Sequence, residues 1–349
     1  MRAAVYKGRG NIVVEDLPVP DIGDGEVLIK VKISSICGTD RKIYKFGHRK
    51  IAEDQEQILG HEITGFIERV GSNVAYYKKG MRVVIAPNVG CGHCAACRKG
   101  LEQLCPDFNA FGISWAGGFA EYLKIPASAV EKGNIVVLPD KLSFKEAAVI
   151  EPLACCYNAY EAMDIKPGDS MLIFGAGPMG ILHLVLNKHL GTGKIIVADI
   201  DESRLAISRD MGADHTVISD KTLRDKIMEL TDGQGVDNII TAAPVPAIQE
   251  QALDLIAING NISYFAGLPS GKEEIKFNSN IVHYKQLKIS GTTGASQKQF
   301  RRTVKLAESP ALNLNNIVTK EIELQELERI FDKPDVFSAN IKIVVDMDL

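Results

Sequence analysis

The stretch MLIFGAGPMG at residues 171–180 decides the fold. Its first four residues are apolar, as in a buried strand, and the glycine pattern G-x-G-x-x-G follows at Gly175, Gly177 and Gly180. Glycines here allow a tight turn and let the backbone approach a pyrophosphate, which the N-terminus of the next helix would receive. The pattern alone is weak evidence, because a glycine turn can occur in any α/β protein.

The surrounding sequence strengthens this interpretation. The next apolar run, KIIVAD at 194–199, ends in Asp199, about twenty residues beyond the glycines, where an acid can bind the ribose hydroxyls of a dinucleotide. The SFKE sequence at 143–146 is a capping box that predicts a helix running to about Met163. From there to about residue 266, strand-like and helix-like runs alternate. This alternation predicts a parallel sheet with helices on both faces.

The flanking sequence has a different pattern. Short β-like runs at 27–33, 63–70 and 82–86 are separated by glycine and proline, and the chain ends in another strand-like run at 341–345. A chain of 349 residues is long enough for two or three domains. We therefore expect an α/β protein in which a doubly wound domain, 153–290, is inserted into a mainly β domain formed by 1–152 and 291–349.

The composition narrows the function classes. Lys and Arg total 40 and Asp and Glu total 44, a net charge of −4, which argues against a nucleic-acid partner. No apolar run reaches the roughly 18 residues of a membrane helix, and the N-terminus has no hydrophobic signal core. We expect a cytoplasmic protein without a membrane partner. Seven cysteines, an odd number, favour metal binding or reduced thiols over a disulfide framework.

Four of the cysteines form the densest motif in the chain. They follow the spacing C-x2-C-x2-C-x7-C, and four thiolates this close can surround a tetrahedral zinc ion with no open position. An iron–sulfur cluster also uses four thiolates, but its common spacings differ from this one. The motif predicts a structural zinc lobe at about 88–106, held by Cys91, Cys94, Cys97 and Cys105.

A second set of possible metal ligands is dispersed. Cys37 lies in the sequence CGTD, His61 and Glu62 lie in GHE, and Glu151 lies in EPL. Sulfur, nitrogen and oxygen ligands together suit a catalytic zinc that keeps one position open. Each residue also fits an ordinary role, as a core cysteine, a loop histidine or a helix-surface acid. The spacing alone leaves both interpretations open.

Taken together and in this order, these motifs resemble those of the zinc-dependent medium-chain dehydrogenases over essentially the whole chain. Within this family the chain resembles the branch of sorbitol, galactitol-phosphate and threonine dehydrogenases. That branch has a glutamate in the EPL sequence, where classical alcohol dehydrogenases have a cysteine. The resemblance implies a GroES-like catalytic domain interrupted by a Rossmann domain, two zinc ions per chain, NAD as the coenzyme and a small alcohol or polyol as the substrate. It also implies a homo-oligomer, either a tetramer or a dimer.

The same resemblance implies roles for individual residues. Cys37, His61 and Glu151 would surround the catalytic zinc, Glu62 is a ligand in some members, and Thr39 matches the hydroxyl that starts a proton relay. The zinc would act as a Lewis acid on the substrate oxygen, and the coenzyme would accept the hydride. The residues that match coenzyme contacts lie in the glycine loop and after later strands: Gly175, Gly177, Pro178, Met179, Gly180, Asp199, Arg204, Ala266, Gly267, Leu268, Thr292 and Thr293.

The chain departs from the family pattern at two places. Lys42 stands where the family often has a histidine, three residues after the relay hydroxyl, and the sequence SGTTGAS at 290–296 lacks the arginine of sorbitol dehydrogenases. Residues 41–50 contain five lysines or arginines. This segment is either a solvated loop or a set of cations that meets a phosphate on the substrate.

The sequence therefore predicts an NAD-dependent oxidation of a secondary hydroxyl in a polyol or sugar derivative, phosphorylated forms included. Oxidation of L-threonine or of a simple secondary alcohol is the alternative within the same class. A non-catalytic coenzyme-binding protein and a metal-free quinone reductase are alternatives of other kinds. The complete ligand set with Thr39 argues against the former, and Cys37, His61 and the four-cysteine lobe argue against the latter.

Overall fold

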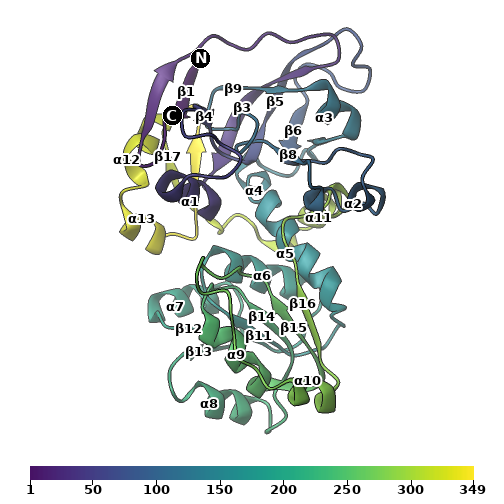
Figure 1. The fold of residues 1–349 in the computed structure, drawn as a ribbon, viewed down its shortest axis with the longest axis vertical. Helices are drawn as coiled ribbons and strands as arrows, with labels where there is room; N and C mark the ends of the chain where they lie inside the picture. The colour runs from purple at the N-terminus through teal and green to yellow at the C-terminus, as the bar shows by residue number, and fades with distance from the viewer. The chain divides into compact units, whose positions relative to one another are not determined.

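The computed structural model describes all 349 residues, which form two compact units (Figure 1). Unit 1 consists of Met1–Ala154 and Ala295–Leu349, and unit 2 consists of Cys155–Gly294. Unit 2 is thus inserted into the chain of unit 1. The domain borders expected at 152/153 and 290/291 stay a prediction, and the borders of the compact units lie close to both.

Unit 2 is built on a six-stranded sheet in which every neighbouring pair of strands is parallel. The strand order is β13-β12-β11-β14-β15-β16, the order of doubly wound dinucleotide-binding domains. The predicted parallel sheet is therefore confirmed. Its strands are β11 (Met171–Phe174), β12 (Ile195–Asp199), β13 (His215–Ile218), β14 (Val236–Thr241), β15 (Ile256–Tyr264) and β16 (Lys288–Gly291).

The central strands of unit 2 are buried from end to end, as expected where helices cover both faces of a sheet. The sequence missed β13, a short strand at the sheet edge that is only partly buried. Helix α9 ends at Leu255, because the chain enters β15 at Ile256. The helices of unit 2 are α6 (Pro178–His189), α7 (Glu202–Asp210), α8 (Leu223–Leu230), α9 (Pro246–Leu255) and α10 (Ser279–Lys285).

Unit 1 is mainly β. Its largest sheet has seven strands, with the path β10-β6-β5-β3-β18-β17 and β9 paired to β3, so the C-terminal strand β18 lies beside β3. A three-stranded sheet, β2-β1-β4, and the pair β7-β8 complete the unit. The strands are β1 (Arg2–Tyr6), β2 (Ile12–Asp16), β3 (Val27–Ser35), β4 (Gln57–Ile58), β5 (Glu62–Val70), β6 (Arg82–Ile85), β7 (Asn88–Val89), β8 (Asn109–Ala110), β9 (Tyr122–Ile125), β10 (Ile135–Val137), β17 (Val318–Ile322) and β18 (Lys342–Asp346).

The helices of unit 1 are short, apart from α5, which continues into unit 2, and α11. The capping box at Ser143 is confirmed: its hydroxyl accepts from the N–H of Glu146 at 3.2 Å, and the Glu146 carboxylate accepts from the N–H of Ser143 at 2.9 Å. The helix expected to run on to Met163 is split in two, because Pro152 lacks an N–H and fits only in the first turn of a new helix. The helices are α1 (Gly38–Phe46), α2 (Ala95–Arg98), α3 (Ala127–Lys132), α4 (Phe144–Ala147), α5 (Ile150–Met163), α11 (Gln297–Ala307), α12 (Leu327–Ile330) and α13 (Pro334–Ser338), with 3-10 turns at Glu102–Leu104, Pro310–Leu312 and Leu324–Glu326.

Helix α1 changes the interpretation of the basic stretch at 41–50. Cys37 caps this helix, and the side chains of Ile43 and Tyr44 anchor it in the core. The helix stops at Gly47, whose φ of +74° lies in the left-handed region that glycine tolerates. The first half of the basic stretch is therefore helical rather than a loop.

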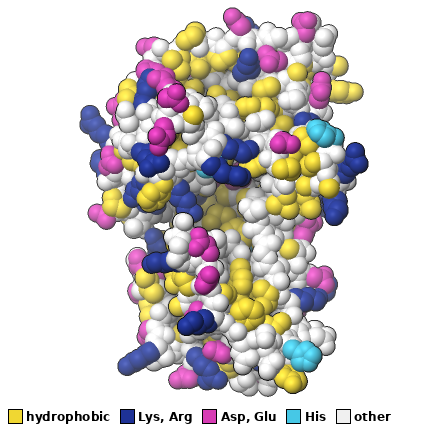
Figure 2. Space-filling view, in the orientation of Figure 1, with side chains coloured by type: hydrophobic (Ala, Val, Ile, Leu, Met, Phe, Trp, Pro, Cys, Tyr) yellow, Lys and Arg dark blue, Asp and Glu magenta, His cyan; other side chains and the backbone are white.

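The surface is mixed in charge. On the face drawn in Figure 2, lysines and arginines are interspersed with aspartates and glutamates on both units, without a broad basic patch. None of the helices has the length and apolar character needed to cross a bilayer.

Candidate active site and coenzyme site

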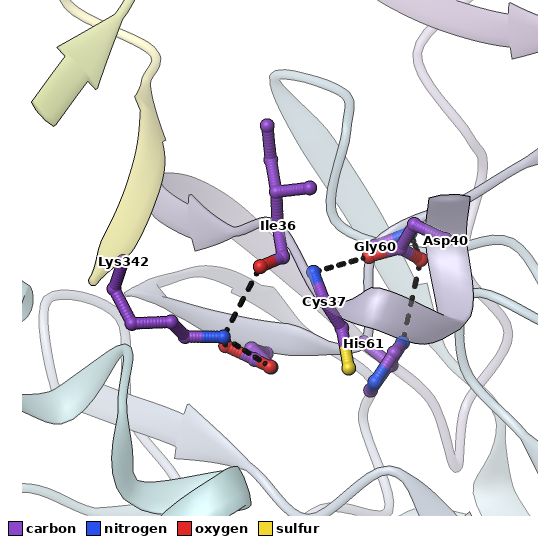
Figure 3. Close-up of polar contacts among 7 residues, drawn as sticks. Ile36, Cys37, Asp40, Gly60, His61 and Lys342 are labelled. Carbon is purple, nitrogen blue, oxygen red and sulfur yellow. Dashed lines mark hydrogen bonds and ion pairs between the residues drawn. The ribbon is translucent and has the colours of Figure 1, made fainter. Parts of the chain in front are cut away.

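Three of the predicted metal ligands converge in unit 1. Cys37 follows the end of β3, whose Ser35 pairs with Glu62 at the start of β5, so the antiparallel ladder brings Cys37 beside His61 and Glu62. One ligand atom from each of Cys37, His61 and Glu62 lies within 4.8 Å of the others. Figure 3 shows Cys37 and His61 side by side.

A buried carboxylate, Asp40, holds two of these residues in place. Its oxygens accept hydrogen bonds from the backbone N–H of Cys37 at 2.8 Å and of Gly60 at 3.3 Å. Its Oδ1 also lies 3.4 Å from Nδ1 of His61 (Figure 3). A carboxylate on one ring nitrogen of a histidine orients the other nitrogen toward a metal. Sequence reasoning included Asp40 in the CGTD motif but gave it no role.

The charges around His61 favour a cation. Burial lowers the pKa of His61, but Cys37 and the carboxylate of Asp40 beside it raise the pKa well above its usual value. These anionic neighbours would stabilise a bound zinc ion in the same way. The donor set of sulfur, nitrogen and carboxylate oxygen fits zinc, which is commonly ligated by these three atom types.

Lys342, which the sequence analysis missed, is the counter-ion of Glu62. Its Nζ lies 2.7 Å from Oε1 and 2.6 Å from Oε2 of Glu62, and it donates to the carbonyl of Ile36 at 3.1 Å (Figure 3). Burial lowers the pKa of Lys342, but Glu62 and then Cys37 raise it more, so the pKa is above its ordinary value. The signal in the sequence was a lone lysine within the apolar terminal run IKIVV at 341–345.

Two further residues are expected at this site, Glu151 and Thr39. Glu151 is the second residue of α5 and lies outside the close group of three, although its carboxylate contributes to raising the pKa of Lys342. Thr39 is half-buried and lies in the first turn of α1, two residues after Cys37. The ligand role of Glu151 and the relay role of Thr39 stay predictions.

The four cysteines of the predicted lobe also converge. Their sulfur atoms all lie within 4.8 Å of one another, and Sγ of Cys91 is 4.0 Å from Sγ of Cys97. Zn–S bonds of about 2.3 Å in a tetrahedron place sulfur atoms about 3.8 Å apart. The backbone N–H groups of His93 and Cys94 lower the pKa of the Cys91 thiol to about 6, whereas burial raises the pKa of the Cys97 thiol to about 12. The arrangement of Cys91, Cys94, Cys97 and Cys105 fits a closed zinc site.

In unit 2, the three glycines of the loop have three different reasons to be glycine. Gly175 has a φ of +100°, and a Cβ at Gly180 would lie 1.7 Å from the carbonyl oxygen of Gly175. A Cβ at Gly177 would meet only a guanidinium nitrogen of Arg204, at 3.8 Å. The space in front of Gly177 is thus open and has a cation beside it, which suits a pyrophosphate at the N-terminus of α6. Pro178 and Met179 form the first turn of that helix.

The other residues expected at the coenzyme lie at the same edge of the sheet. Asp199 ends β12, and its carboxylate accepts from the N–H of Ala176 at 2.6 Å and of Asp201 at 3.0 Å. Parallel strands end at one edge of a sheet, where doubly wound domains bind dinucleotides. The remaining expected residues follow two further strands of the sheet. Ala266, Gly267 and Leu268 come after β15, and Thr292 and Thr293 come after β16.

Comparison with known proteins supports the fold and the class. Residues 23–139 match the alcohol dehydrogenase GroES-like domain, and residues 178–309 match the zinc-binding dehydrogenase family. The chain is 33% identical to a sorbitol dehydrogenase of Bacillus subtilis, over 99% of this chain and 97% of that protein. It is 32% identical to an L-threonine 3-dehydrogenase of Pseudoalteromonas atlantica, over 94% of this chain and 95% of that protein.

A solved structure supports the same fold and class of protein. An alcohol dehydrogenase of Escherichia coli CFT073 in complex with NADH superimposes with a TM-score of 0.90 at 26% identity, covering 99% of both chains. The chain described here belongs to the zinc-dependent medium-chain dehydrogenases, in the branch that includes the polyol and threonine dehydrogenases. It is an oxidoreductase of the zinc-containing alcohol and polyol dehydrogenase type, with a GroES-like domain and a Rossmann domain.

Proposed function

We propose that this enzyme oxidises a secondary hydroxyl of a polyol or sugar derivative and transfers the hydride to NAD. The observation that carries the proposal is the group formed by Cys37, His61 and Glu62, with Asp40 and Lys342 buried behind it. Three different donor atoms on one side and fixed partners on the other are what a metal site needs if it is to leave a position open for substrate.

The residues of this chain have separate tasks in such a reaction. When bound, the zinc ion supplies Lewis-acid polarisation of the substrate oxygen. Asp40 fixes the ring of His61, and Lys342 neutralises Glu62, so the ligands keep their geometry while charge develops on the substrate. Thr39, in the first turn of α1, would accept the hydroxyl proton of the substrate and pass it toward solvent. In this proposal one carboxylate, from Glu62 or from Glu151, completes the ligand set.

The coenzyme is proposed to be NAD rather than NADP. The Asp199 carboxylate is buried at the end of β12, where it can accept hydrogen bonds from both ribose hydroxyls. A 2′-phosphate in the same place would meet a like charge. Arg204, beside Gly177, reduces that repulsion, so the expected preference is strong but not absolute.

The relatives and the polar site support the proposed substrate class. The sorbitol dehydrogenase relative favours a polyol, and the threonine dehydrogenase relative favours L-threonine as the second candidate. The test is a panel of polyols, their phosphates, L-threonine and simple secondary alcohols, each assayed with NAD and NADP. The polyol proposal is wrong if threonine or an unbranched alkanol has the highest kcat/KM.

Two finer proposals rest on the family resemblance. The enzyme is expected to be cytoplasmic and to assemble as a homotetramer or homodimer. Light scattering of the purified protein would test the second point, and a mass equal to one chain would refute it.

A further inference from the structure

Two lysines from outside the four-cysteine lobe hold its two ends. Nζ of Lys132, in the last turn of α3, donates to the carbonyl of Gly90 at 2.7 Å, one residue before the first cysteine. Nζ of Lys50, beyond the end of α1, donates to the carbonyl of Phe108, three residues after the last cysteine. The lobe and both lysines belong to unit 1. Cations from two other segments of this unit therefore fasten the lobe where the chain enters it and where the chain leaves it.

The Lys132 end lies directly against the sulfur atoms. A Cβ at Gly90 would be only 2.6 Å from Sγ of Cys97, so the Gly90 backbone contacts one of the four sulfurs. The stem of Lys132 also lies over the next turn, because its Cε is 3.6 Å from the position of a Cβ at Gly92. The ammonium group of Lys132 is thus held beside the cluster by its own contacts.

The Lys50 end lies beside the buried cysteine of the four, Cys105. The N–H of Phe108 donates to the carbonyl of Cys105 at 3.2 Å, and Nζ of Lys50 is 3.6 Å from the centre of the Phe108 ring. Burial lowers the pKa of Lys50, and Arg49 lowers it further. Cys105 and Asp107 act in the opposite direction, as anionic groups near the ammonium group do. Lys50 is therefore close in space to a sulfur of the lobe.

The zinc form of the lobe lacks positive charge. Four thiolates around one Zn²⁺ leave two negative charges in excess. The segment 88–108 does not balance them, because it contains two lysines or arginines and two aspartates or glutamates. Three backbone N–H groups donate to sulfurs of the lobe, but amides bring no net charge. A charge beside a buried atom is costly unless it is paired, and Lys50 and Lys132 supply the two missing charges.

Other cations in these segments are placed differently. Lys99, within the lobe, is exposed to solvent. In the basic stretch at 41–50, the guanidinium group of Arg41 stacks on Phe337 at 4.0 Å. Three further members of the stretch are exposed, namely Lys42, Lys45 and Arg49. Lys50 thus has a structural surrounding that neither a solvated loop nor a contact with a substrate phosphate describes.

We propose that Lys50 and Lys132 are the counter-ions of the four-cysteine zinc site, and that they slow the loss of its zinc. They balance the charge of the thiolates and fix the two ends of the lobe. Both act through the cysteines and the backbone rather than on the metal, so they are positioning residues. The proposal concerns the retention of the structural zinc and does not depend on which alcohol the enzyme oxidises.

The experiment measures how fast the zinc-loaded enzyme loses the zinc of the lobe to an excess of a chromogenic chelator. Cys94→Ser, which opens the lobe, identifies the phase of zinc release that belongs to it. Lys50→Met and Lys132→Met each remove one charge and keep a long side chain, whereas Lys132→Arg keeps the charge. Lys99→Met is the matched control, since it removes an exposed lysine of the lobe. Thermal melting in excess zinc verifies that each variant is folded.

We expect zinc release from the lobe to be about tenfold faster in Lys50→Met and in Lys132→Met, because partners around metal ligands commonly change metal affinity by this factor or more. Release should be less than about twofold faster in Lys99→Met and close to the wild-type rate in Lys132→Arg.

The proposal is wrong if Lys50→Met and Lys132→Met retain zinc as the wild type does, or if Lys99→Met loses it equally fast. Release from Lys132→Arg at the rate of Lys132→Met would show that the shape of the side chain matters rather than its charge, which would also overturn the proposal. A wild-type lobe without zinc would refute both the counter-ions and the closed zinc site, whereas the proposed oxidation of a polyol has its own test in the substrate panel.

Discussion

The ammonium group of Lys342 lies 2.7 Å and 2.6 Å from the two carboxylate oxygens of Glu62, and both side chains are almost completely buried. The two residues are 280 positions apart and meet because β18 and β5 both lie beside β3. A buried carboxylate next to a metal ligand is acceptable only when it is paired. Lys342 is therefore the partner that makes the buried Glu62 carboxylate tolerable, and it holds that carboxylate in place beside Cys37 and His61.

Removal of the lysine charge should be costly. Lys342→Met leaves Glu62 buried without a partner, and we expect unfolding free energy to fall by about 3–5 kcal/mol. Lys145→Met, which breaks an exposed pair with Glu321 on the same unit, should cost less than about 1 kcal/mol. Denaturant unfolding measures both, and equal losses would contradict the role of the buried pair. The double variant Glu62→Gln, Lys342→Met should recover part of the loss.

His183 predicts an acid-sensitive stability. Burial lowers the pKa of His183 to about 3 from 6.5, and neither ring nitrogen has a hydrogen-bond partner. Because the pKa in the folded state is depressed, its stability contribution is complete above pH 6.5 and is lost as the pH falls toward 3. The slope is up to about 1.4 kcal/mol per pH unit.

His183→Leu removes this titration and fills the same apolar site beside Phe265. We expect the variant to be at least as stable as the wild type at pH 7 and less sensitive to acid in that window. His189→Leu, at the half-buried C-terminal end of the same helix, is the control and should keep the wild-type slope. Unchanged pH dependence of melting in His183→Leu would show that the buried ring is not responsible.

The two proposed zinc sites should respond differently to loss of one thiol. Cys94→Ser opens the closed site, so we expect the loss of one zinc per chain and a lower melting temperature, because a structural zinc contributes directly to folding. Cys37→Ser should abolish turnover and leave the melting temperature nearly unchanged. Metal analysis and thermal melting of the two variants provide the comparison. The assignment is wrong if Cys94→Ser is stable and inactive while Cys37→Ser is active and unstable.

Asp199 should determine coenzyme choice. Asp199→Ala would remove the two hydrogen bonds proposed to the ribose, so the KM for NAD should rise about tenfold or more while the KM for NADP falls. Asp201→Asn is a matched control, since it removes a neighbouring charge but keeps the cap of α7. A variant at Asp199 that uses NAD as well as the wild type does would refute the proposal.

Most of the fold and much of the site could be predicted from local sequence motifs. The glycine loop, the acid at Asp199 and the alternation of strands and helices predicted the parallel sheet, because each depends on neighbours within one supersecondary unit. The cysteine spacing likewise predicted that the four sulfur atoms would converge. Hydrophobic periodicity missed β13 and the break before α5, since a half-buried edge strand and a proline in a first turn leave weak patterns.

Long-range partners were beyond the sequence. Nothing near Glu62 indicates Lys342, and nothing near Gly90 indicates Lys132, because each pair is brought together by sheet pairing and loop packing rather than by spacing. The engagement of Lys50 with Phe108 also depends on tertiary structure. The sequence therefore presents 41–50 as one basic segment, whereas in the structure its lysines and arginines lie in different surroundings.

The most direct test of the central claim is the rate of NADH formation from a polyol before and after removal of the metal. We expect activity with the preferred polyol to disappear when the more accessible zinc is chelated, to return when zinc is restored, and to be absent in Cys37→Ser at any zinc concentration. A preparation that is fully active with no zinc or other divalent metal would contradict the account.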